Sequence, residues 1–229
     1  MVKNINIKKS VIAIGNFDGV HKGHQEIFKL GKKIAKKNKK KFGIVTFSPL
    51  PSEFFQKEKK NIRITLDDIK IDLLKKNKAD FVFICNFNKK FSQVTAEKFI
   101  ENIIVNKLQA SHVLVGKNFR FGHQRKGTIT LLKKYGVIFN YKVLDIKLSK
   151  QKKLKISSTR IRFAIEKGNV ELVSQLLGRY WSIKEKVIAG KKLGRSLGFR
   201  TANVEIKNNI NPKTGVYAVK ALVNNKKYS

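Results

Sequence analysis

The stretch from Val11 to His24 constrains the fold more than any other part of the chain. It opens with four apolar residues, typical of a short buried strand, and the residues after it carry apolar side chains at helical spacing through Lys37. Three glycines between the two elements allow tight turns and a close approach of a ligand to the backbone: Gly15, Gly19 and Gly23. A strand is therefore predicted to lead into a helix whose first N–H groups can bind an anion, and phosphate is the expected ligand.

Two histidines stand at the start of this predicted helix. His21 and His24 are three residues apart, so they face the same side, and each can donate an imidazole N–H to a phosphoryl oxygen. The helix dipole adds to that attraction. Asp18 is not expected to contact phosphate directly, because like charges repel unless a cation lies between them, and we expect it to contact Mg²⁺ or a ribose.

A second polar cluster opens another predicted helix. It comprises three hydroxyls and two guanidinium groups: Ser157, Ser158, Thr159, Arg160 and Arg162. Helix capping would account for one hydroxyl but not for the whole cluster, which predicts a phosphate clamp. The two arginines are two residues apart and do not share a helix face, so one of them can instead be a solvated charge.

These two motifs resemble a known family. The segments GNFDGVHKGH (15–24) and ISSTRIR (156–162) are similar to the adenylyltransferase domain of the bacterial bifunctional riboflavin kinase/FMN adenylyltransferases, also called FAD synthetases. Other segments that resemble the same family follow in order, at 45–51, 115–122, 125–127, 194–203 and 215–219. The chain departs from the family at Leu50, where His is usual, and at Arg200, where Pro is usual.

The resemblance implies adenylyl transfer from MgATP to FMN, giving FAD and pyrophosphate, in a family that also phosphorylates riboflavin. It implies catalytic roles for His21, His24 and Arg162. The residues expected at ATP are Gly15, Asn16, Phe17, Asp18, Gly23, Ser157, Ser158, Thr159 and Arg160. Those expected at the flavin are Asn118, Phe119, Arg120 and Arg125, with ordinary core packing as the alternative for Phe119. Thr201 and Asn203 match the kinase motif, where Thr201 is expected to contact Mg²⁺.

Two other classes of function are open. The first motif alone also fits related nucleotidyltransferases with another acceptor. The formal net charge of +36 suggests a nucleic-acid-binding protein, but only eight of the 51 basic residues are arginines and the lysines are spread along the chain. We therefore expect lysine-rich solvated faces that steer ATP and FMN, with nucleic acid an unlikely partner.

The remaining composition favours a cytoplasmic protein. The single cysteine, Cys85, lies in an apolar run and is expected to be a core thiol, and one cysteine leaves no disulfide within the chain. The sequence contains no apolar run near the roughly 20 residues that a membrane helix needs, and we expect no membrane partner.

Strands alternate with helices along most of the chain, which predicts a Rossmann-like α/β fold with a parallel sheet. The predicted strands are 10–15, 42–47, 81–85, 112–115 and 137–146, and the predicted helices are 22–38, 65–77, 95–107, 127–135 and 158–177, with a capping box at Thr65 and a break at Gly168-Asn169. This domain is expected to span residues 1–178. Residues 179–229 then read as the start of an antiparallel β-barrel of the riboflavin kinase type, with strands at 181–189, 201–206 and 216–223. The printed sequence ends at Ser229 after about three of them, so we expect this chain to lack riboflavin kinase activity.

Overall fold

A parallel five-stranded sheet forms the centre of the molecule. The computed structural model describes residues 7–56, 61–146, 156–190, 198, 201–224 and 226–228. The strands follow the order β3-β2-β1-β4-β5. Their bounds are Val11–Ile14 (β1), Phe42–Ser48 (β2), Phe81–Asn86 (β3), His112–Gly116 (β4) and Lys142–Ile146 (β5). The strand order reverses between β1 and β4, and in such sheets ligands bind beyond the carboxyl ends of the strands at that point.

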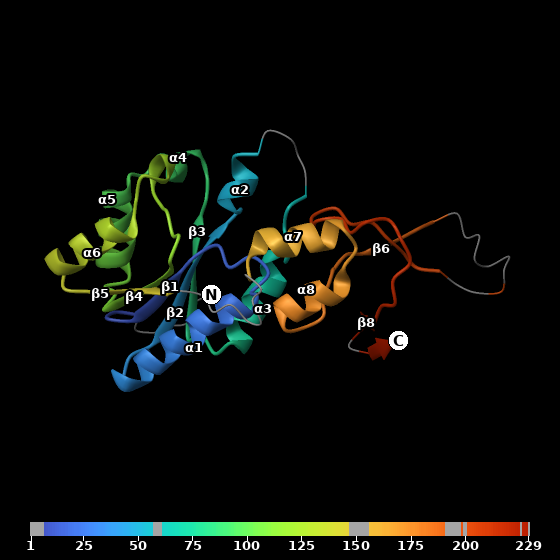
Figure 1. The fold of residues 1–229 in the computed structure, drawn as a ribbon, viewed down its shortest axis with the longest axis horizontal. Helices are drawn as coiled ribbons and strands as arrows, with labels where there is room; N and C mark the ends of the chain where they lie inside the picture. The colour runs from blue at the N-terminus through green and yellow to red at the C-terminus, as the bar shows by residue number, and fades with distance from the viewer. Residues whose placement is uncertain are drawn as a thin grey trace.

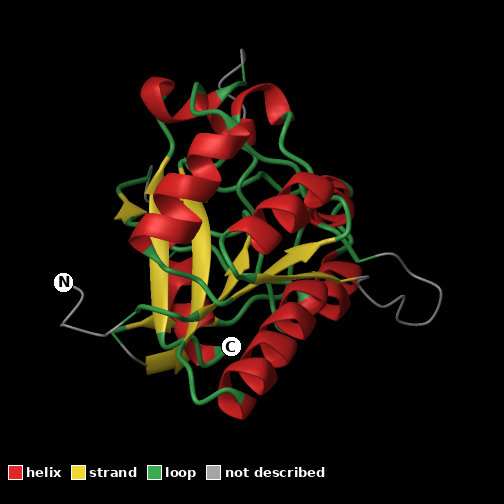
Figure 2. Cartoon of the chain, turned by 90° about the vertical axis from the view of Figure 1, so that its left-hand side faces the viewer, coloured by secondary structure: helices red, strands yellow, loops and turns green. Residues whose placement is uncertain are grey.

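Helices cover both faces of the sheet (Figures 1 and 2). Alternate residues of β1 point to opposite faces: Ala13 packs with Phe28 on the side of α1 (Lys22–Lys37) and α3 (Asp67–Lys76). Ile12 packs with Phe99 on the side of α5 (Ala96–Phe99), the π-helical segment Ile100–Lys107 and α6 (Ile129–Ile138). The sheet is therefore buried on both faces, as a parallel sheet requires.

Shorter helices complete the molecule around the ends of the strands. They are α2 (Pro51–Phe54), α4 (Lys89–Ser92), α7 (Ser158–Glu166) and α8 (Val170–Leu177). The last two pack on each other through a third apolar cluster that contains Ile161 and Leu176 from the helices and Ile64 from the loop before α3. In Figure 1 the two helices lie to one side of the sheet, beside α3. This arrangement brings the sequence around residue 158 to the end of β1.

Most of the predicted elements are confirmed, including the break at Gly168-Asn169, and two predictions are wrong in detail. The strand expected at 137–146 begins only at Lys142, because α6 continues through Ile138. The helix expected at 158–177 is two helices, divided near Gly168 as the Gly-Asn pair indicated. Thr65 does not cap α3: the N-cap residue is Leu66, and the buried Thr65 hydroxyl has no hydrogen-bond partner among the described residues.

The last part of the chain is antiparallel. β6 (Val187–Ile188) pairs with β7 (Asn203–Val204), and β8 (Ala221–Val223) pairs with β9 (Lys226–Tyr228). The antiparallel type is as predicted, but the described strands are shorter than expected and β9 was not predicted. Arg200 and most of the segment 194–200 lie outside the described residues.

Candidate functional site

The turn at residues 15–24, here called the glycine turn, runs from β1 into α1 as predicted. His21 is the N-cap of α1, and its Nδ1 accepts a hydrogen bond from the backbone N–H of His24 at 3.2 Å. The two imidazole rings are stacked, with centroids 3.5 Å apart. The Phe17 ring is perpendicular to the His24 ring, and their centroids lie 5.1 Å apart. The histidine pair therefore lies together at the positive end of a 16-residue helix.

Both histidines are neutral at pH 7. Burial lowers the pKa of His21 to about 4. Burial, together with the repulsion that a protonated His21 ring would exert, lowers the pKa of His24 well below its ordinary value. Because Nδ1 of His21 accepts a hydrogen bond, the proton of the neutral ring is on Nε2. Nδ1 of His24 is buried and has no partner within the described ranges. The pair can thus donate hydrogen bonds to a phosphoryl oxygen without carrying charge.

The two predicted motifs meet at Asp18. Its carboxylate is only 2% exposed and accepts hydrogen bonds from the backbone N–H groups of Ile64 and Thr65 at 3.1 and 3.2 Å. A guanidinium nitrogen of Arg162 donates to the same carboxylate at 2.6 Å, and its Nε donates to the Ile62 carbonyl at 2.7 Å. Burial raises the pKa of the Asp18 carboxyl, and the Arg162 charge opposes that rise. Asp18 is therefore a buried anchor that ties the glycine turn to α7.

This geometry corrects the expectation that Asp18 contacts Mg²⁺ or a ribose. Both carboxylate oxygens are already engaged by N–H donors, and the side chain is buried. In the described part of the chain, no three His, Cys, Asp or Glu side chains gather as metal ligands. The residues present do not fit a protein-bound Mg²⁺ at this turn.

In the hydroxyl cluster, one serine caps α7 and another connects α7 to the glycine turn. Ser157 is the N-cap of α7 and accepts from the Arg160 backbone N–H at 3.3 Å. Ser158 donates its hydroxyl hydrogen to the Asp18 carbonyl at 3.0 Å, a second link between the motifs. Thr159 is exposed and Arg160 is half-buried. Roles at the nucleotide for these four residues stay predictions.

The start of the glycine turn is closely packed. A side chain at Gly15 would lie 3.1 Å from the Phe17 ring, and Gly23 is buried in the first turn of α1. The Asn16 carbonyl accepts a hydrogen bond from the buried Thr46 hydroxyl at 3.0 Å. These contacts fix the course of the backbone from β1 to the histidine pair.

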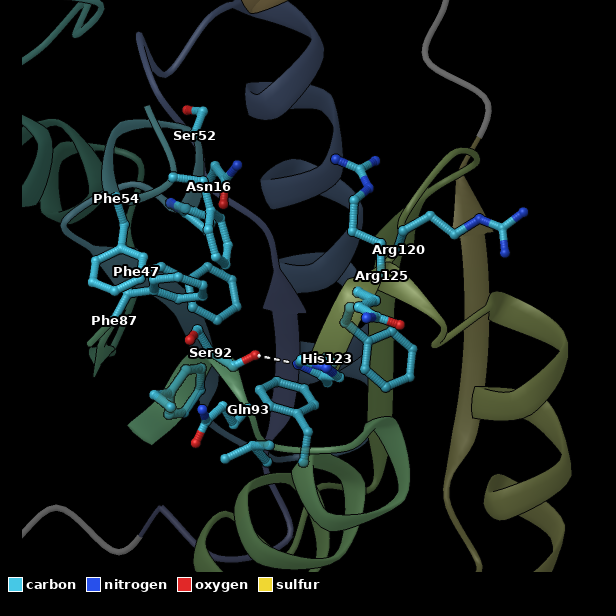
Figure 3. Close-up of a pocket in the computed structure, with 18 of the residues that line it drawn as sticks. Asn16, Phe47, Ser52, Phe54, Phe87, Ser92, Gln93, Arg120, His123 and Arg125 are labelled. Atoms are coloured by element: carbon cyan, nitrogen blue, oxygen red, sulfur yellow. Dashed lines mark hydrogen bonds between the residues drawn. The ribbon is translucent and has the colours of Figure 1, made fainter. Parts of the chain in front are cut away.

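An aromatic pocket of about 920 Å³ opens beside this turn (Figure 3). All four residues predicted for the flavin side line it, together with Asn16 of the glycine turn: Asn118, Phe119, Arg120 and Arg125. Phe119 stacks on Phe121 with ring centroids 5.5 Å apart and an interplanar angle of 14°. Figure 3 shows Arg120 and Arg125 on the side of the pocket opposite Phe54 and Phe87. The pocket thus has an aromatic wall and a cationic rim.

Sequence reasoning missed most of the aromatic wall. Six more phenylalanines of the pocket come from β2, from α2 and its C-cap, from the region between β3 and the end of α4, and from α5: Phe47, Phe54, Phe55, Phe87, Phe91 and Phe99. Phe87 is central, because its ring centroid lies 5.4 Å from that of Phe54 and 5.7 Å from that of Phe91. His123 also lines the pocket, and one of its ring nitrogens lies 3.1 Å from the Ser92 carbonyl oxygen. The richness of the sequence in phenylalanine, 16 residues, was the available signal.

The kinase-like residues are not brought to this site. Thr201 and Asn203 are exposed, and Asn203 lies in β7 with its amide beside Gly190. Leu50, where the family usually has His, is buried at the N-cap of α2 and is not among the pocket residues. Cys85 is buried as predicted, and burial raises its thiol pKa to about 12, so it is an inert core thiol.

The parallel sheet, the histidine pair at α1 and the hydroxyl cluster at α7 define a Rossmann-like nucleotidyltransferase. Residues 3–160 match the FAD synthetase family, and residues 177–229 match the riboflavin kinase family. The chain therefore belongs to the FAD synthetase family and carries riboflavin kinase sequence after that domain. The family predicted from the sequence is confirmed, and with it the class of enzyme, a transferase of FAD biosynthesis.

The names of similar curated proteins combine the same two activities. Proteins named bifunctional riboflavin kinase/FMN adenylyltransferase are 44% identical in Buchnera aphidicola (subsp. Schizaphis graminum), 39% identical in Bacillus subtilis and 35% identical in Escherichia coli K12. These matches cover 96%, 96% and 93% of this chain and 70%, 70% and 68% of the relatives.

A solved structure has the same fold. The crystal structure described as a macrolide-efflux protein from Streptococcus pneumoniae superposes with a TM-score of 0.86 at 31% identity, over 96% of this chain and 72% of that one.

Among the described residues, we find no helix with the length and apolar character needed to span a membrane.

Proposed function

We propose that this chain transfers the adenylyl group of ATP to FMN, giving FAD and pyrophosphate. The observation that carries the proposal is that Asn16 belongs both to the glycine turn and to the wall of the aromatic pocket. An anion site at the start of α1 therefore opens directly onto a pocket suited to a flat aromatic ring. A nucleotide in the first and a flavin in the second would meet end to end.

The reaction is a direct displacement at phosphorus. An oxygen of the FMN phosphate attacks the α-phosphorus of ATP, the bond to the β-phosphate oxygen breaks, and pyrophosphate leaves with the electron pair. The chain contributes position and charge stabilisation, with no covalent intermediate. The Nε2–H of His21, together with His24, donates hydrogen bonds to the ATP phosphates as charge shifts toward the leaving group. Mg²⁺ bound to the nucleotide itself stays a prediction.

The flavin side of the proposal divides between the two halves of the pocket. Phenylalanine rings on the aromatic wall would contact the isoalloxazine ring, where a planar apolar surface is the complementary partner. Arg120 and Arg125 are exposed on the opposite rim and would bind the FMN phosphate. This arrangement would hold the attacking phosphate between the pocket and the glycine turn.

Riboflavin phosphorylation is a separate question. Residues 177–229 match the riboflavin kinase family, but the apolar side chains of the described strands there are exposed, including Val187 at 64% and Leu222 at 66%. The described strands of this part therefore do not bury these side chains in a common core. We therefore expect FAD from FMN but no FMN from riboflavin.

The test is product formation followed by chromatography. Purified chain is incubated with MgATP and either FMN or riboflavin, and FAD, FMN and pyrophosphate are quantified. His24→Ala should lower FAD formation about 100-fold, which corresponds to about 3 kcal/mol of transition-state stabilisation. His112→Ala is the matched control, because His112 begins β4 at the opposite end of the sheet from the glycine turn. The proposal fails if the unmodified chain forms no FAD from FMN. If the unmodified chain forms FAD and both variants form it at the same rate, the function stands and the role of the histidine pair is wrong.

A further inference from the structure

Arg179 contacts the glycine turn from outside the matched FAD synthetase region. It follows Gly178, the left-handed C-cap of α8, and it lies in the stretch that matches riboflavin kinase. One of its guanidinium nitrogens donates to the Gly19 carbonyl at 2.9 Å. Gln25 ties the same connection from the other side, since its amide donates to the carbonyls of Val20 and Leu177. The start of the kinase-like sequence is thereby fixed against the turn that begins α1.

The second terminal nitrogen of Arg179 is unsatisfied. Nη1 is buried and has no hydrogen-bond partner within the described ranges, and none of the ion pairs found there involves Arg179. Burial lowers the pKa of Arg179 to about 10, so the group is still charged at pH 7. A buried charge without a counter-ion is costly, and the usual solution is an anionic partner.

A comparison with Arg162 shows why this charge matters. Arg162 contacts the Asp18 side chain and Arg179 contacts the Gly19 carbonyl, but within the described ranges only Arg162 is neutralised, by the Asp18 carboxylate at 2.6 Å. Arg179 has no such carboxylate among the described residues. Its charge is close enough to His21 to contribute to the lowered pKa of that ring. The positive charge of Arg179 therefore acts on His21 of the histidine pair, whereas most of the field of Arg162 is cancelled locally.

We propose that Arg179 supplies positive charge to the binding of the ATP polyphosphate at the start of α1. The kinase-like part of the chain would then complete the nucleotide site of the adenylyltransferase part. The inference rests on the proposed function, because it assigns a further residue to the same site. The competing account is purely structural: Arg179 only ties the Gly19 carbonyl.

Two substitutions separate charge from hydrogen bonding. Arg179→Gln keeps an N–H donor for the Gly19 carbonyl and removes the charge, whereas Arg179→Lys keeps the charge. Lys184→Gln is the matched control, because Lys184 lies on the same connection, is 70% exposed and pairs with Asp68 away from the turn. Thermal unfolding of each variant checks that the fold is retained.

The measurement is the affinity for MgATP and for adenosine, by calorimetric titration, beside FAD formation. Arg179→Gln should weaken MgATP binding about 10-fold or more and leave adenosine, which has no phosphates, unchanged. Arg179→Lys and Lys184→Gln should stay within about threefold of the unmodified chain. The KM for ATP should rise in Arg179→Gln while the KM for FMN does not.

The binding and activity measurements distinguish a failure of the inference about Arg179 from a failure of the proposed function. If the unmodified chain binds MgATP and forms FAD but Arg179→Gln binds MgATP equally well, the inference about Arg179 is wrong and the proposed function stands. Equal loss of MgATP and adenosine binding, or equal loss in Arg179→Gln and Arg179→Lys, leaves Arg179 as a structural tie and also overturns the inference. If the unmodified chain neither binds MgATP nor forms FAD, the proposed function itself fails.

Discussion

Arg162 and Asp18 form a 2.6 Å ion pair that joins two sequence motifs 144 residues apart. The carboxylate is 2% exposed, and the guanidinium side chain is 23% exposed. Ser158 strengthens the same junction through the Asp18 carbonyl. The glycine turn and the start of α7 therefore form one rigid unit, and the aspartate that sequence reasoning assigned to Mg²⁺ or a ribose holds that unit together.

Asp18→Asn should destabilise the chain by about 3 kcal/mol. The amide cannot neutralise Arg162, and it leaves a largely buried guanidinium facing a neutral group. The free energy of unfolding from urea denaturation measures the loss. Lys133→Gln is the control, because its pair with Asp145 is exposed and should contribute no more than about 1 kcal/mol. Equal effects of the two variants would mean that the buried pair has no special role.

The lowered pKa of His21 predicts a loss of stability in acid. Between pH 6.5 and about 4, the unfolded chain binds a proton at this ring that the folded chain excludes, so stability falls as the pH falls through this window. From pH 7.5 to pH 5 the contribution of His21 should be a loss of about 2 kcal/mol. His21→Asn keeps an N-cap side chain but cannot titrate. Its free energy of unfolding should therefore fall by about 2 kcal/mol less than that of the unmodified chain over the same pH range. Burial is the larger cause of the lowered pKa of His24 and acts in both proteins, so most of the His24 contribution cancels from the comparison.

Arg125→Gln should raise the KM for FMN about 10-fold and leave the KM for ATP unchanged. Arg125 is exposed on the pocket rim, and removing one charge-assisted contact to a phosphate has about this effect. Riboflavin, which has no phosphate, should bind Arg125→Gln as well as it binds the unmodified chain. Lys126→Gln is the control, since Lys126 is also exposed but does not line the pocket. A change in the KM for ATP alone would place Arg125 at the nucleotide instead.

The parts of the fold that the sequence predicted well are those with a local cause. β1, the glycine turn and α1 follow from a short apolar run, glycines and helical periodicity in adjacent residues. The predicted end of α6 was wrong because the apolar residues that follow its predicted end misled the prediction. Val137 and Ile138 read as the start of a strand, but they end the helix with 86% and 61% of their surfaces exposed, so their apolar character did not report burial.

The parts of the site that could not be predicted depend on tertiary contacts. The aromatic wall is assembled from Phe47 in β2, Phe54 in α2 and Phe87 after β3, which no spacing rule connects. Arg179 is a single charge after a helix cap, and only the fold shows that it reaches Gly19. Asp18 had the right residue type for a metal contact, but its partners Ile64 and Arg162 come from distant segments.

A network of four charged side chains connects α3 to α2. Lys70 is 2% exposed, and its ammonium lies 2.8 Å from the Asp67 carboxylate, which also accepts from Arg63 at 2.9 Å. Arg63 pairs in turn with Glu53 of α2 at 2.8 Å, and α2 supplies Phe54 to the pocket. Burial acts to raise the pKa of Asp67, but hydrogen bonds from Lys70 and other donors hold it at about 2.

Asp67→Asn removes the charge that compensates buried Lys70, so it should cost about 3 kcal/mol of unfolding free energy. It should also raise the KM for FMN, because Arg63 then holds α2 through Glu53 alone. Asp68→Asn is the matched control: the adjacent carboxylate pairs with the exposed Lys184, and the loss should stay below about 1 kcal/mol with no change in the KM for FMN. Replacing Lys70 by Met in the Asp67→Asn background should recover part of the stability, because no buried ammonium is then left unpaired. Urea denaturation of the three variants measures this, and a double variant no more stable than Asp67→Asn would show that the loss has another cause.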